Sequence, residues 1–117
     1  GFIVALDAAG RVRWQVIDRD WHYFANAYSD AGGRWVVAGV RIRTVDGVNQ
    51  FYDFGLRGFT AAGETSWSVR HRAGQESQGW TLAPHPSGGW WAAGLRTDDF
   101  VDFDVDVLRV DDRGELD

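Results

Sequence analysis

The sequence predicts an all-β protein built from repeated, four-stranded antiparallel units. The stretch 88–94 repeats the earlier stretch 32–39, and each reads as a Gly-rich turn, a short apolar run and a closing Gly. Gly occurs 15 times and Trp 7 times, aromatic residues make up 15% of the chain, and only 2 Pro are present, which is typical of a turn-rich β protein. No segment of useful length has the i, i+3, i+4, i+7 apolar spacing of a helix.

The first unit contains four predicted strands. An apolar strand from Phe2 is followed by the turn 7–10, Asp-Ala-Ala-Gly, and by the alternating strand 11–17. Two short strands around a Gly-containing turn predict a β-hairpin. After a polar break at 18–20, the aromatic-rich stretch 21–28 and the run 35–42 are the third and fourth strands.

The same pattern then starts again. Residues 58–69 repeat 5–16, with a period of 53 between Gly10 and Gly63, and a Trp stands four residues after the Gly in both, at Trp14 and Trp67. Residues 107–115 repeat 56–64 with a period of 51, and Gly39 and Gly94 differ by 55. The chain therefore divides into units 1–52, 53–102 and 103–117, with four, four and two predicted strands.

A unit of this size cannot bury both faces of its own small sheet, so the units must stack face to face. Four-stranded antiparallel units that repeat every ~51–55 residues suggest the blades of a β-propeller. The segments 2–10 and 104–114 and the Gly-Gly-Arg-Trp-Val-Val-Ala-Gly run at 32–39 together resemble the bacterial SBBP-type β-propeller repeats. This resemblance covers nearly the whole chain and implies an architecture rather than an activity.

Two blades and half of a third do not close a ring, because the chain starts on the same type of strand as each unit. Simple symmetric copies do not supply the two strands that the last half-blade lacks. We therefore expect a segment of a larger propeller, packed against neighbouring blades of the same or another chain, with closure by homo-oligomerisation as the alternative.

The most concentrated charge lies in the acidic run 98–106. Oxygen ligands at alternate positions are what Ca²⁺ uses, so the candidate ligands are Asp98, Asp99, Asp102 and Asp104. The alternative is a solvated strand face, because the alternation also places the acidic side chains on one side of a strand and Phe103 and Val105 on the other. Calcium is the only cofactor that the sequence suggests.

Exposed aromatic rings beside polar groups commonly bind sugar rings by stacking and hydrogen bonding. The candidate ligand-binding residues are Trp35, Trp90, Trp91 and Arg96. Trp90 and Trp91 are adjacent, so on a strand they point to opposite faces. The alternative for each tryptophan is packing between blades, and this is the role expected for Trp14 and Trp67.

Several classes of function are disfavoured. The net charge of -5 argues against a phosphate-binding surface, so nucleic acid is not an expected partner. The absence of Cys excludes thiolate chemistry, and no apolar run approaches the ~20 residues of a membrane-spanning helix. The three His share no ligand-like spacing and no Gly-x-Ser-x-Gly occurs, so no catalytic residue is assigned.

We therefore expect a non-catalytic propeller repeat segment that acts as a binding or scaffold surface for protein or glycan ligands. The resemblance implies a bacterial protein that is secreted, periplasmic or on the cell surface. Two alternatives stay open: a glycan-binding lectin assembled from several copies, and a fragment of a propeller enzyme whose catalytic residues lie elsewhere.

Overall fold

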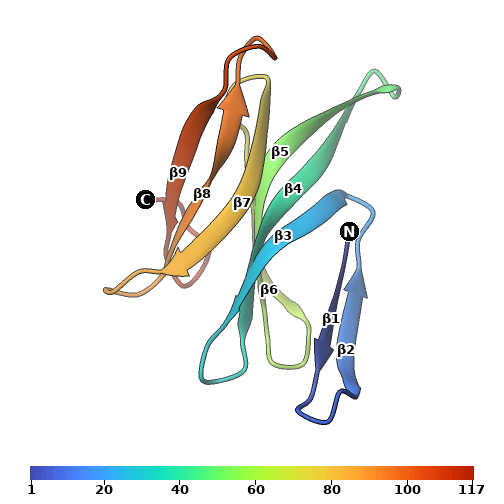
Figure 1. Ribbon diagram of the computed structural model, residues 1–117, viewed down its shortest axis with the longest axis vertical. Coiled ribbons are helices and arrows are strands. Elements are labelled where there is room, and N and C mark those ends of the chain that lie inside the picture. The colour runs from blue at the N-terminus through green and yellow to red at the C-terminus, as the bar shows by residue number, and fades with distance from the viewer.

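A computed structural model describes all 117 residues, which form nine antiparallel β-strands and no helix (Figure 1). It accordingly contains no helix that could span a membrane. The strands are β1 (Phe2–Leu6), β2 (Val12–Ile17), β3 (Trp21–Ser29), β4 (Trp35–Val45), β5 (Asn49–Phe59), β6 (Thr65–His71), β7 (Glu76–Pro84), β8 (Trp90–Thr97) and β9 (Asp104–Val110).

The strands form three sheets, each a simple meander in chain order. Strands β1 and β2 form a hairpin, β3–β4–β5–β6 form a four-stranded sheet, and β7–β8–β9 form a three-stranded sheet. A tenth predicted strand is reduced to one bridge between Val110 and Leu116. The prediction of an all-β, antiparallel fold is confirmed, and the three sheets do not close a ring (Figure 1).

The sheets do not follow the borders of the sequence repeat. Residues 52 and 53 both lie inside β5, and the border at 102/103 falls between β8 and β9, which pair with each other. The sheets are instead separated after β2 and after β6. The repeat and the sheets are thus out of phase by two strands, because a period gives the size of a unit but not where the hydrogen-bonded sheet begins.

Five hairpin turns share one geometry. In each, the fourth residue is a Gly with φ between 78° and 91°, and its N–H donates to the carbonyl of the first residue. A type I turn followed by a left-handed residue is a common hairpin connection, and Gly adopts that conformation without steric cost. The turns are 7–10, 30–33, 60–63, 85–88 and 111–114.

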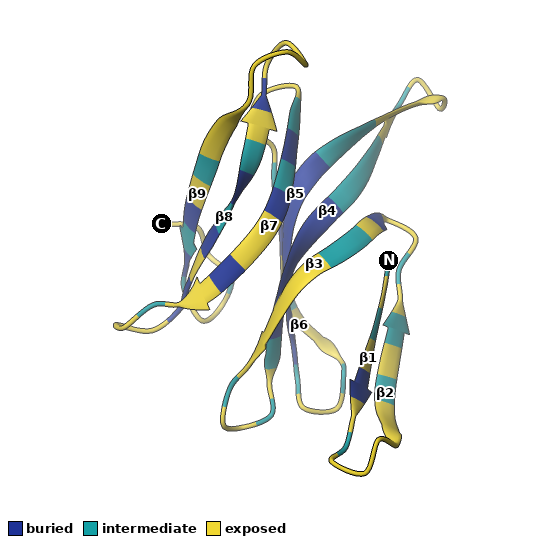
Figure 2. Cartoon of the chain, viewed as in Figure 1, coloured by how far each residue is buried: buried dark blue, intermediate teal, exposed yellow.

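The main core lies between the four-stranded and the three-stranded sheet (Figure 2). At its centre, the ring of Phe54 on β5 lies against two glycines of the other sheet: a Cβ on Gly79 would lie 2.7 Å, and one on Gly94 2.9 Å, from ring carbons of Phe54. Gly94, the closing glycine of the stretch 88–94, therefore leaves room for the ring of Phe54 from the neighbouring sheet. The buried cluster comprises Val36, Ala38, Phe54, Leu56, Val69, Leu82, Trp90, Ala92, Leu108 and Val110.

The opposite face of the four-stranded sheet carries buried charges and an indole ring. The guanidinium of Arg57 lies 5.1 Å from the ring of Trp21 and donates from Nη2 to Oδ2 of Asp18 at 2.5 Å. Asp18 precedes β3, so this ion pair ties the connection after the β1–β2 hairpin to the centre of β5. Burial by itself would raise the pKa of Asp18, but the hydrogen bond from Arg57, that from the backbone N–H of Asp20 and the nearby arginine charges together lower it.

Candidate functional site

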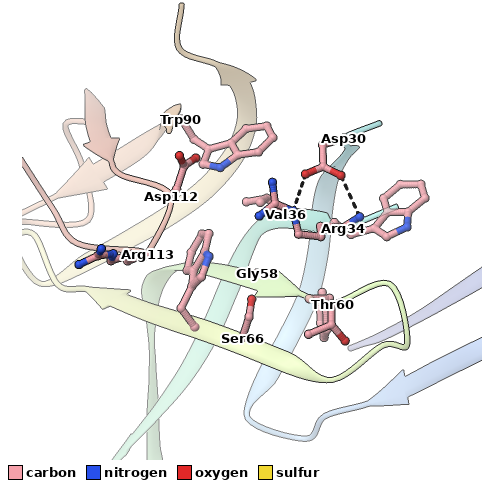
Figure 3. Close-up of a pocket in the computed structure, with 12 residues that line it drawn as sticks. Asp30, Arg34, Val36, Gly58, Thr60, Ser66, Trp90, Asp112 and Arg113 are labelled. Atoms are coloured by element: carbon pink, nitrogen blue, oxygen red, sulfur yellow. Dashed lines mark hydrogen bonds and ion pairs between the residues drawn. The ribbon is translucent and has the colours of Figure 1, made fainter. Parts of the chain in front are cut away.

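A pocket of about 280 Å³ opens at the end of the molecule where three of the hairpin turns meet (Figure 3). The turns 30–33, 60–63 and 111–114 supply its rim, and the first residues of β4, β6 and β8 supply its walls. Its lining residues are Asp30, Arg34, Trp35, Val36, Gly58, Phe59, Thr60, Ser66, Trp67, Trp90, Asp112 and Arg113. We call these residues the turn-end pocket.

Three tryptophans line the turn-end pocket. Trp35 starts β4 and Trp90 starts β8, and Trp67 lies on β6, where it packs against the main core. Trp90 is the most buried of the three, and its ring meets that of Tyr28 edge-on, with centroids 5.2 Å apart. Trp67 and Trp90 therefore come from two sheets and are fixed by packing, which favours a preformed apolar surface.

One side of the rim is fixed by Asp30 and Arg34 (Figure 3). The Oδ1 of Asp30 accepts hydrogen bonds from the backbone N–H groups of Gly32 and Arg34, at 2.8 and 3.0 Å, and its Oδ2 accepts from Nε of Arg34 at 2.6 Å. The hydrogen bond from the backbone N–H of Arg34, supported by the guanidinium, lowers the pKa of Asp30. The carboxylate is thus held in its charged form at the mouth of the pocket.

The other side of the rim belongs to the last turn. Asp112 accepts a hydrogen bond from the backbone N–H of Gly89 at 3.1 Å, which links the turn 111–114 to the start of β8. Arg113 lies beside it, with no carboxylate within ion-pair distance. The carboxylate of Asp112 and the guanidinium of Arg113 therefore lie across the hollow from Asp30 and Arg34 (Figure 3).

Of the four predicted ligand-binding residues, the structure brings two together. Trp35 and Trp90 line the turn-end pocket. Trp91 points to the opposite face of its sheet, where it is 42% exposed and its ring lies 5.2 Å from that of His85. Arg96 lies near the other end of β8, opposite Asp104, and does not line the turn-end pocket.

The acidic run is a loop followed by a strand. Only Asp104 of the four predicted calcium ligands lies in β9, and the others precede it. The Oδ1 of Asp99 accepts from the N–H groups of Val101 and Asp102, both at 2.9 Å, and these bonds, that of Asp102 first, lower the pKa of Asp99. No three acidic or His side chains in the chain are grouped closely enough to hold a metal ion. Calcium binding stays a prediction.

Sequence reasoning missed most of the rim of this pocket, including Asp30, Arg34 and Asp112, and assigned Trp67 to packing alone. Asp30 and Asp112 carried one signal, since each belongs to a repeated turn. Which turns lie side by side follows from the order of the sheets, and that order was not contained in the repeat. No family model and no curated protein sequence matches the chain, so the site stands on its geometry alone.

Proposed function

We propose that the chain is a non-catalytic segment of propeller-type repeats and that its turn-end pocket binds a glycan. The observation that carries this proposal is the combination of three tryptophans, two aspartates and two arginines around one hollow. A sugar ring offers an apolar face for stacking and hydroxyl groups for charged hydrogen-bond partners. A volume of about 280 Å³ is close to the lower limit of small-molecule sites and suits one sugar unit rather than a long chain.

The roles of the residues follow from their places. Trp35 is partly exposed on the wall and supplies the stacking surface, whereas Trp90 is buried and supports the floor. Asp30 accepts hydrogen bonds from sugar hydroxyls, and Arg113 donates them from the opposite rim. This division predicts that the indole of Trp35 contributes to affinity and that the charges contribute to the choice of sugar.

The test is titration calorimetry with a panel of monosaccharides and short oligosaccharides. We expect binding that falls about tenfold or more in Trp35→Ala, because ring stacking is lost. Trp91→Ala is the matched control, since it removes an exposed indole of the same chain on the other face. A panel without any binding sugar, or equal affinity of Trp35→Ala and the unmodified chain, would contradict the proposal.

Three other functions expected from the sequence remain alternatives: binding of a protein ligand, a lectin assembled from several copies, and a fragment of a propeller enzyme. A protein ligand on the same surface would bind without a response to sugars, and a lectin assembled from several copies would show a multiple of the 13.1 kDa mass in native mass spectrometry. A propeller enzyme would require catalytic groups outside these residues. The bacterial, secreted or surface setting is carried by the resemblance of the repeats.

A further inference from the structure

The molecule contains two copies of one contact between neighbouring units. Trp14 of β2 lies on the turn 60–63: a Cβ on Gly63 would be 2.6 Å from its ring, and its Nε1 donates to the carbonyl of Ala61 at 3.1 Å. In the same way, a Cβ on Gly114 would be 2.5 Å from the ring of Trp67. In each copy, the tryptophan of one unit covers the turn glycine of the next.

The first turn has the same structure but no such cover. Gly10 has φ 81°, and Asp7 accepts hydrogen bonds from the N–H groups of Ala9 and Arg11, both at 2.9 Å. A Cβ on Gly10 would meet no atom within 4 Å. The carbonyl of Ala8, which occupies the place of Ala61 in its turn, accepts no backbone hydrogen bond.

A third position confirms that the first turn lacks a neighbour. Leu6, Phe59 and Val110 occupy the same place in the three units, four residues before the turn glycine. Phe59 is 1% and Val110 0% exposed, whereas Leu6 is 56% exposed. The ring of Phe59 lies 5.6 Å from that of Trp14, so the tryptophan that covers the glycine also covers this apolar side chain.

We propose that Leu6, Ala8 and Gly10 form an acceptor for the tryptophan of a further unit of this same repeat. The incoming indole lies on Gly10, covers Leu6 and donates from Nε1 to the carbonyl of Ala8. A second copy of this chain is not the occupant, because both of its tryptophans of this type, Trp14 and Trp67, already cover its own turns. The inference rests on the assignment of the sheets to propeller repeats, and the acceptor residues Leu6, Ala8 and Gly10 do not line the turn-end pocket.

The test is an extended chain in which residues 54–104 are copied in front of Gly1. The copied Trp67 then precedes Gly10 by 47 residues, the same separation as between Trp67 and Gly114. In the 117-residue chain, Gly10→Ala lowers the free energy of unfolding only through the backbone strain of an alanine in the left-handed conformation. In the extended chain, its Cβ meets the indole, and we expect the equilibrium constant for unfolding to rise by a further factor of about ten or more.

Two controls separate strain from contact. Gly47 has φ 69° and nothing within 4 Å, so Gly47→Ala should have the same cost in both proteins. Replacing the copied Trp67 with Ala should return the cost of Gly10→Ala in the extended chain to its value in the 117-residue chain. Urea denaturation gives the equilibrium constants, and hydrogen exchange should show slower exchange of the β1 and β2 amides in the extended chain.

Three outcomes would overturn the inference. The first is an equal cost of Gly10→Ala in both proteins, and the second is an extended chain that fails to fold or is less stable than the 117-residue chain. The third is a dimer of the 117-residue chain in sedimentation equilibrium that Gly10→Ala dissociates, which would assign the acceptor to a second copy. None of these readouts uses a sugar, so they are independent of the result for the turn-end pocket.

Discussion

Asp53 lies on β5 with no exposed surface, and both of its carboxylate oxygens accept a hydrogen bond from an arginine. Oδ1 accepts from Nε of Arg43 at 3.2 Å, and Oδ2 accepts from Nη1 of Arg70 at 3.1 Å. These arginines come from β4 and β6, the two neighbours of β5. One side chain thus neutralises charges on both flanking strands of the four-stranded sheet.

Asp53→Ala should lower the free energy of unfolding by about 3 kcal/mol, because it leaves two partly buried arginines without their counter-ion. Asp104→Ala removes a carboxylate from an exposed position on β9 and should change the free energy of unfolding by less than about 0.5 kcal/mol. Urea denaturation of both variants measures the difference. Equal effects would show that the pairing of Asp53 adds nothing to stability.

The repeated turns predict how stability depends on pH. Hydrogen bonds from backbone N–H groups, those of Arg11, Arg34 and Glu115 first, lower the pKa values of Asp7, Asp30 and Asp111 below their usual 3.8. In each of these turns, the charged carboxylate stabilises the folded state. Because its pKa is lower in the folded than in the unfolded chain, this stabilisation is fully present above the unfolded pKa and is lost as the pH falls through the folded pKa.

Asp30→Asn should therefore flatten the acid side of the stability profile, below about pH 4, while stability at neutral pH changes less. The amide keeps an oxygen that can accept the backbone hydrogen bonds but has no charge to titrate. Asp98→Asn is the control, because the side-chain carboxylate of Asp98 accepts no hydrogen bond, whereas its neighbour Asp99 accepts several. An acid slope that is identical in both variants would contradict this account.

At the level of elements, the β1–β2 hairpin is attached to the rest of the chain by few contacts. Its buried apolar side chain is Ala5, and it contributes none of the main core cluster. Trp14 joins it to the turn 60–63, and the Asp18–Arg57 ion pair joins the following connection to β5. The indole is therefore the principal side-chain contact between the hairpin itself and the four-stranded sheet.

Trp14→Ala should release this hairpin without unfolding the other two sheets. We expect faster hydrogen exchange of the β1 and β2 amides by about tenfold or more, with little change in β8 and β9. Trp80→Ala, which removes an exposed indole on β7, is the control. Uniformly faster exchange throughout the chain would instead show that the hairpin and the core unfold as one unit.

The loop before β9 is the element on which the calcium prediction depends. If Asp98, Asp99, Asp102 and Asp104 bind calcium in the folded state, millimolar calcium chloride should raise the melting temperature. Asp99→Asn should abolish that rise. An unchanged melting temperature of the unmodified chain would remove the prediction and leave Asp99 as a residue that orders the loop through its two backbone hydrogen bonds.

At the scale of the whole molecule, the sequence predicted the length and strand content of the repeat unit but not where each hydrogen-bonded sheet begins and ends. The turn glycines, the paired positions of Trp14 and Trp67 and the all-β class followed from the repeat. The sheet borders did not, because strand pairing is decided by which hairpins are tight and where the breaks at 18–20 and 72–75 lie. The turn-end pocket could not be predicted for the same reason, since its rim joins turns up to 81 residues apart.

Apolar side chains are exposed on both outer sheets of the stack. Phe2 and Leu6 are exposed on the hairpin, and Trp91, Val105 and Val107 on the three-stranded sheet. The molecule measures 45 × 34 × 20 Å along its principal axes. Each end of the stack thus presents a face of the kind that is covered where two sheets of this chain meet.

The two-strand offset between repeat and sheet means that a complete sheet is a joint product of two successive units. The first half of the four-stranded sheet, β3 and β4, lies in unit 1–52, and the second half consists of β5, which crosses the border at 52/53, and β6. Because the units repeat, joining one unit directly to another would place half-sheets of the same type side by side at each border. Adding or removing one unit would then change the number of sheets by one, while every strand keeps the type of partner that it has here.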